Sequence, residues 1–236
     1  MKRFRTYIMS AFAMAAVLGS CGKSDGPDTP VNPDPDPNPD KPSETVTYAV
    51  GDFYSKGFVK GIVVKVDEKG EHGLLVALSE TEAAWSYRYD DVMSGQPGTG
   101  AYNTSLVQKL DGWKDYYPAF VNATSQNIGA LKDWFLPSMN ELASLYQAWT
   151  GHETNDTEEG TGSTKAGMSE EEHKAWFDKC LTDNKGEAIS GTVYWSSSES
   201  GPSIVYAFDM STGTTVSTPS DLDKKKIHKV RAMASF

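Results

Sequence analysis

WFLPSMNEL, at residues 134–142, contains the clearest helix start in this 236-residue chain. Ser138 and Glu141 are spaced as a capping box, in which both side chains accept hydrogen bonds from backbone N–H groups that a first helical turn leaves unpaired. Apolar residues follow at helical spacing, namely Leu142, Leu145, Tyr146 and Trp149. We therefore predict a helix that begins at Ser138 and packs one face against a core.

Further helices are indicated on both sides of this stretch. A second capping box, Ser169 to Glu172, begins a helix whose apolar stripe holds Trp176, Phe177, Cys180 and Leu181. Two shorter helices are predicted over 103–110 and 116–124, the second with a proline tolerated in its first turn. On an apolar helix face, the Cys180 thiol is expected to be buried and unreactive.

Strands are predicted before and after the helices. Residues 61–66 and 74–78 are rich in β-branched and aliphatic residues and flank a polar turn, so they predict a hairpin. The second is apolar on both faces, as in a central strand. The other predicted strands cover 192–196, 203–210, 214–217 and 227–235. This order predicts an α+β fold with an antiparallel sheet and flanking helices.

The N-terminus carries an export signal. Lys2, Arg3 and Arg5 precede a short apolar run, the layout of a secretory signal peptide, and that run is too short to span a bilayer. The following Leu-Gly-Ser-Cys at 18–21 resembles a bacterial lipoprotein box, which implies cleavage before Cys21 and a diacylglycerol on its sulfur. An ordinary signal peptide followed by a chance cysteine is the alternative.

The residues after Cys21 indicate a spacer. Prolines and aspartates alternate up to Pro42, with almost nothing apolar to bury, so the segment is predicted to be disordered and extended. Three parts are therefore expected: a signal peptide at 1–20, a lipid-anchored linker at 21–45 and one domain at 46–236. The early acidic residues loosely resemble surface-export signals, so we expect an outer-membrane lipoprotein displayed at the cell surface.

Charge and cysteine content narrow the function classes. Loss of residues 1–20 changes the formal net charge from −10 to −13, and so acidic a chain disfavours nucleic acid and anionic lipid as partners. Membrane contact is then expected through the lipid alone. Only Cys21 and Cys180 occur, so a lipidated Cys21 leaves no intrachain disulfide, and stability must come from a packed core.

Three motifs together resemble one family. They are WFLPS at 134–138 with Glu141-Leu142, YWSSSE at 194–199, and KVRAM at 229–233. Their order is similar to the C-terminal domain of bacterial collagen-like proteins, a family of unknown function. The resemblance implies a single C-type-lectin-like domain over about residues 48–236. We interpret the motif residues as scaffold, because a tryptophan ahead of Leu-Pro can pack under the helix and a small-residue strand allows close backbone approach. The calcium-dependent sugar motifs and the paired thiols of that fold's other members are not matched, so those activities are not expected.

A candidate binding segment lies at 80–100, where aromatic, basic and acidic residues alternate between chain breakers. Its candidate ligand contacts are Trp85, Tyr87, Arg88, Tyr89 and Asp90. Exposed aromatic rings beside carboxylates suit an extracellular glycan or protein partner. In the alternative interpretation, Trp85 fills the core and the tyrosines line a strand edge.

No motif for catalysis, a cofactor or a metal is recognised. Calcium binding by acidic clusters is conceivable at 90–91, at 153–159 and at Asp221 with Asp223, but solvated surface charge explains them as well. The sequence therefore favours a non-catalytic binding module of unknown ligand. An accessory subunit of a surface fibre is the alternative, and a hydrolase with paired carboxylates is a third interpretation.

Overall fold

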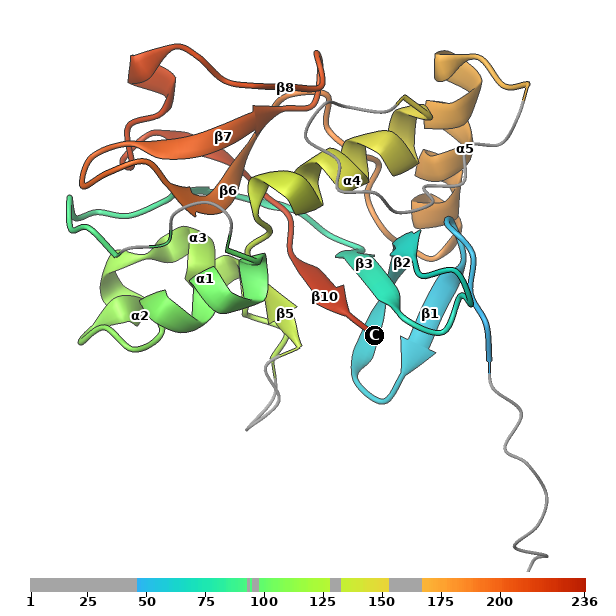
Figure 1. The fold of residues 1–236 in the computed structure, drawn as a ribbon, viewed down its shortest axis with the longest axis horizontal. Coiled ribbons are helices and arrows are strands. Elements are labelled where there is room, and N and C mark those ends of the chain that lie inside the picture. The colour runs from blue at the N-terminus through green and yellow to red at the C-terminus, as the bar shows by residue number, and fades with distance from the viewer. Residues whose placement is uncertain (1–45, 93, 95–97, 128–132, 153–166) are drawn as a thin grey trace, which may run out of the picture. The chain divides into compact units, whose positions relative to one another are not determined.

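The computed structural model describes residues 46–92, 94, 98–127, 133–152 and 167–236 (Figure 1). These residues form an α+β fold of two five-stranded sheets with helices packed against them, which confirms the predicted class. The signal peptide, Cys21 and the Pro/Asp-rich linker lie outside the described residues, as does the acidic cluster at 153–159.

The first sheet contains the predicted hairpin. Its strands, in spatial order, are β1 (Phe53–Lys56), β2 (Val59–Val66), β3 (Gly73–Ala77), β10 (Met233–Ser235) and β5 (Trp134–Phe135). All neighbours are antiparallel. Leu75 and Val76 of β3 face opposite sides and are both fully buried, which confirms that this strand is central.

The second sheet holds most of the C-terminal strands. Its order is β4 (Thr81–Ala84), β9 (Ile227–Val230), β6 (Val193–Glu199), β7 (Val205–Asp209) and β8 (Thr214–Thr215). The β6 and β9 strands run parallel, and the other pairs are antiparallel. A short 3₁₀ turn, Pro219–Asp221, lies between β8 and β9.

The predicted strand at 227–235 is in fact two strands in different sheets. β9 pairs with β4 and β6, whereas β10 pairs with β3 and β5. Arg231 and Ala232 connect them and are buried. Buried apolar residues occur on both sides of the crossing, at Val230 and at Met233, so the local sequence pattern does not reveal it.

Five helices are present in the described residues: α1 (Gly100–Val107), α2 (Trp113–Tyr116), α3 (Pro118–Ala123), α4 (Met139–Thr150) and α5 (Glu170–Asp183). Both capping boxes are formed, at Ser138 with Glu141 and at Ser169 with Glu172. The helix predicted at 116–124 is divided, because Tyr117 has φ −123° and ψ 67°, outside the helical region.

The buried apolar side chains form two hydrophobic clusters, and strands and helices contribute residues to both. One contains Trp85, Phe120 and Trp195, and the other contains Leu142, Phe177 and Phe208. Helix α4 contacts β2 of the first sheet and β6 and β7 of the second, so it helps to join the two sheets (Figure 1). Cys180 on α5 is only half-buried beside the second cluster, less than predicted.

Candidate functional site

The segment after β4 begins with a buried anchor, Trp85. Its indole is fully buried and donates from Nε1 to the carbonyl oxygen of Ser196 at 2.8 Å. Its ring meets the edges of Tyr117 and Phe120, with centroids 5.9 and 5.0 Å away. The prediction of an exposed Trp85 is therefore wrong, and the alternative interpretation, in which it fills the core, is the observed one.

A buried ion pair lies under the same segment. Glu199, at the end of β6, pairs with Lys224, and both side chains are almost completely shielded from solvent. Lys224 also donates to the Asp90 carbonyl oxygen at 2.6 Å, and Glu199 accepts from the Val92 backbone N–H at 2.9 Å. The buried pair thus fixes the backbone of residues 90–92 from the interior side.

Burial disfavours the ionised form of both Glu199 and Lys224. It is the largest cause that raises the pKa of the Glu199 carboxyl, against the lowering effect of Lys224. Burial likewise lowers the pKa of Lys224, against the raising effect of Glu199. The ammonium group also lies 4.7 Å from the centroid of the Trp85 ring, which provides further stabilisation for the cation.

Above this base, the side chains of residues 87–90 reach the surface. Tyr87 and Tyr89 are 56% and 44% exposed, and Arg88 and Asp90 are exposed as well. The Arg88 guanidinium carbon lies 3.2 Å from the ring centroid of Tyr116, which ends α2. Four of the five predicted contact residues are therefore exposed, and Trp85 is not.

Residues from the β9 side complete this surface. The Tyr89 hydroxyl donates to Asp223 at 3.0 Å, and the hydrogen bond raises the pKa of the phenol. The Lys225 ammonium lies 4.1 Å from the centroid of the Tyr89 ring. We call the set Tyr87, Arg88, Tyr89, Tyr116 and Lys225 the tyrosine surface.

Sequence reasoning missed Tyr116 and Lys225, because both join the tyrosine surface only through the fold. Tyr116 is connected by its backbone carbonyl, which accepts from the Tyr87 N–H at 2.8 Å. Lys225 follows Lys224, whose own carbonyl accepts from the Ser86 N–H at 3.0 Å. No local pattern in the sequence links these positions to residues 87–90.

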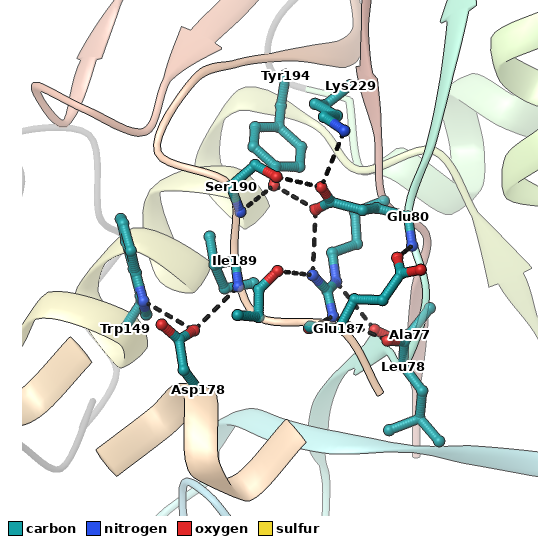
Figure 2. A network of polar contacts seen from close by, with 12 residues as sticks. Ala77, Leu78, Glu80, Trp149, Asp178, Glu187, Ile189, Ser190, Tyr194 and Lys229 are labelled. Atoms are coloured by element: carbon teal, nitrogen blue, oxygen red, sulfur yellow. Dashed lines mark hydrogen bonds and ion pairs between the residues drawn. The ribbon is translucent and has the colours of Figure 1, made fainter. Parts of the chain in front are cut away.

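A second buried polar network is centred on Arg231 and Glu80 (Figure 2). The guanidinium donates to Glu80 at 3.1 Å and to four backbone carbonyls. These carbonyls belong to Ala77, Leu78, Glu187 and Ala188, at 2.7–3.2 Å. Arg231 thereby connects the end of β3 with the segment that follows α5.

Glu80 accepts from several donors at once. Ser190 and Tyr194 donate their hydroxyls to it, and the Lys229 ammonium lies 3.3 Å away. Burial tends to raise the pKa of this carboxyl, but the hydrogen bonds and Arg231 outweigh it, so the pKa is lowered. A carboxylate held ionised by so many donors is suited to holding these segments of the scaffold together.

The acidic residues proposed for calcium have other partners where they are described. Asp223 binds Tyr89, and Asp221 lies 3.2 Å from the Lys226 ammonium. Among the described residues, no three His, Cys, Asp or Glu side chains are grouped to hold a metal ion. In the same residues, no helix is long and apolar enough to cross a membrane.

Comparison with known proteins identifies a similar fold but no family. No protein-family model and no curated protein matches the chain. The fold is similar to the crystal structure of a fimbrial protein from Bacteroides ovatus ATCC 8483, with a TM-score of 0.50 and 15% identity. The match covers 75% of this chain and 44% of that protein, so the chain corresponds to less than half of its neighbour. At this identity the likeness shows the fold alone.

Proposed function

We propose that this chain is a non-catalytic recognition module, displayed outside the cell, that binds a protein partner through the tyrosine surface. The observation that carries the proposal is the packing of Arg88 on Tyr116 and of Lys225 on Tyr89, with the exposed Tyr87 adjacent to Arg88 in the chain. Tyrosine and arginine are the residue types most enriched where protein interfaces concentrate their binding energy.

The surface is held rigidly before any partner arrives. Trp85 and the Glu199–Lys224 pair fasten the segment from below, and the Tyr89 hydroxyl is held by Asp223. Side chains that are already ordered lose less conformational entropy on binding, so more of the contact energy appears as affinity. This arrangement supports a role in recognition over one in packing alone.

The geometry favours a protein over a glycan. A sugar ring would stack on an open aromatic face, but cations already lie over two of the three tyrosine rings of this surface, those of Tyr116 and Tyr89. Charged groups packed on aromatic rings instead offer hydrogen-bond donors beside apolar area, which suits the mixed surface of a protein partner. Binding of a glycan is therefore an outcome that the test must be able to detect.

The second candidate function is an accessory subunit of a surface fibre. Its support is the fold similarity to a fimbrial protein from Bacteroides ovatus. In this version the partner at the tyrosine surface is a fibre subunit, and the lipid on Cys21 would anchor the assembly at the outer membrane. The two candidates share one contact surface and differ in the partner that occupies it.

The test compares the full-length chain with the double variant Tyr87→Ala/Arg88→Ala. Tyr102→Ala is the matched control, because Tyr102 is a similarly exposed tyrosine, at 57%, on α1. Each protein is immobilised to capture cell-surface proteins, and each is also applied in solution to a glycan array. We expect one protein that binds the wild type and the control but not the double variant.

Two results would contradict the proposal. Equal capture of the same protein by the wild type and the double variant would remove the tyrosine surface from the contact. A glycan signal that is lost with Tyr87→Ala/Arg88→Ala would replace the protein partner with a sugar. Identification of the captured protein as a fibre subunit would decide for the second candidate.

A further inference from the structure

The first sheet ends at a strand edge, where no further strand of the described residues is paired. β1 is its outermost strand, and Phe53, Ser55 and Lys56 are exposed there. Phe53 remains 40% exposed, and Phe58 in the following turn remains 67% exposed. An open edge that carries exposed aromatic residues can pair with another strand, which natural proteins usually prevent.

The register shows which backbone groups point outward. The Val63 N–H donates to the Asp52 carbonyl at 3.0 Å, and Tyr54 and Lys56 lie opposite Gly61 and Val59. Hydrogen-bonded positions alternate along an antiparallel strand, so Tyr54 and Lys56 direct their N–H and C=O groups toward β2. Phe53 and Ser55 therefore direct theirs away from the sheet, toward the open edge.

We propose that β1 pairs with β1 of a second copy of this chain, antiparallel about a two-fold axis at Tyr54. Phe53 of each copy then lies opposite Ser55 of the other, and their outward N–H and C=O groups form four hydrogen bonds across the axis. The two five-stranded sheets become one continuous sheet. A two-fold axis requires a self-complementary edge, which this strand provides.

Charge selects this register. With Tyr54 at the axis, Lys56 of each copy lies directly opposite Asp52 of the other, on the same face of the sheet. Both residues are exposed in the single chain. The Asp52 carboxylate accepts from the Ala49 N–H through Oδ2 at 2.8 Å, so Lys56 of the other copy would meet Oδ1. A shift of the axis to residue 53 or 55 also aligns the outward groups, but it places Lys56 opposite Val50 or Tyr54 and loses both ion pairs.

The same register covers exposed apolar surface. The two Phe53 side chains become diagonal neighbours across the axis, a distance that aromatic side chains can bridge. The contact uses a short strand, so the dimer is expected to be weak and concentration-dependent. This proposal goes beyond the proposed function and does not rest on it, because it involves none of the tyrosine surface.

The test measures self-association of the full-length chain by analytical ultracentrifugation in a density-matched mild detergent, up to about 1 mM. Lys56→Asp places like charges opposite each other twice, and we expect the dimer dissociation constant to rise about tenfold. The swap Asp52→Lys/Lys56→Asp restores both opposite-charge pairs, and we expect a dissociation constant within about threefold of the wild type.

Two further variants separate the edge contact from other effects. Lys60→Asp makes the same charge change one strand further in, at an exposed position of β2, and is expected to leave the dimer unchanged. Ser55→Pro removes an outward N–H that β2 does not use, so it should abolish the dimer while the unfolding temperature is retained. A monomeric wild type over the whole range, or equal effects of Lys56→Asp and Lys60→Asp, would overturn the proposal.

Discussion

Replacing Lys224 by methionine should destabilise the protein more than any surface substitution. Methionine retains most of the side-chain volume but removes the ammonium group, which contacts Glu199, the Asp90 carbonyl and the Trp85 ring. Glu199 would then be a buried carboxylate without its cation. Removal of one partner of a buried ion pair costs about 3–5 kcal/mol, because the remaining charge stays desolvated.

That cost is a large part of the total free energy of unfolding, which is about 5–15 kcal/mol for most domains. For a domain of this size it corresponds to a fall of about 6–20 °C in unfolding temperature. Urea unfolding followed by tryptophan fluorescence measures it directly. Lys225→Met is the matched control, because Lys225 is the exposed neighbour and its loss should change stability by no more than about 0.5 kcal/mol.

The double variant Lys224→Met/Glu199→Gln tests the cause. It removes both charges and keeps an oxygen that can accept from the Val92 N–H, so part of the lost stability should return. If Lys224→Met costs no more than Lys225→Met, the pair is not what holds residues 90–92. If the loss of unfolding free energy in the double variant equals the sum of the losses in Lys224→Met and Glu199→Gln, the two residues are not coupled.

Three other predictions concern the scaffold. Arg231→Lys should lower the free energy of unfolding by about 2–4 kcal/mol in urea titrations, because an ammonium group cannot reach all the carbonyls that the guanidinium contacts; an unchanged midpoint would contradict this. Because the pKa of Glu80 is lowered in the folded state, its ionised carboxylate stabilises the fold above about pH 4.5, and this contribution is lost as the pH falls through the folded-state pKa. Glu80→Gln should therefore make the free energy of unfolding depend less steeply on pH on the acid side. A dependence as steep as in the wild type would assign the acid sensitivity to other groups. Gly70→Ala should cost about 1–3 kcal/mol more than Gly57→Ala by thermal unfolding, because both glycines have positive φ but only at Gly70 would the new methyl meet a backbone oxygen, that of Tyr48 at 2.6 Å; equal costs would show that the contact relaxes.

The parts of the fold that sequence predicts well are those decided by near neighbours. Ser138 and Glu141 are three residues apart, and their capping box begins α4 where expected. The split of 227–235 depends instead on where β3 and β6 lie, and those strands are far away in the chain. A local apolar pattern cannot show which sheet receives each half of such a segment.

The exposed residues of the candidate site could be predicted from the sequence, but the buried residues under them, Trp85, Glu199 and Lys224, could not. Alternating aromatic and polar residues indicated that Tyr87 and Tyr89 are exposed, as they are, yet the same pattern could not show that Trp85 points inward. Glu199 and Lys224 are 25 positions apart, and each alone resembles an ordinary surface charge. Their pairing becomes visible only when β6 and the segment before β9 are brought together.

The order of strands in the first sheet has a consequence for folding during synthesis. β10 supplies the strand between β3 and β5, and it pairs Ser235 with Leu74, about 160 positions earlier. While the chain emerges from a ribosome, the backbone N–H and C=O groups on one edge of β3 lack their strand partner until residues 233–235 arrive. Such late closure favours slow folding and exposure to aggregation in the interval. The first sheet can thus be completed only after residues 233–235 have been synthesised.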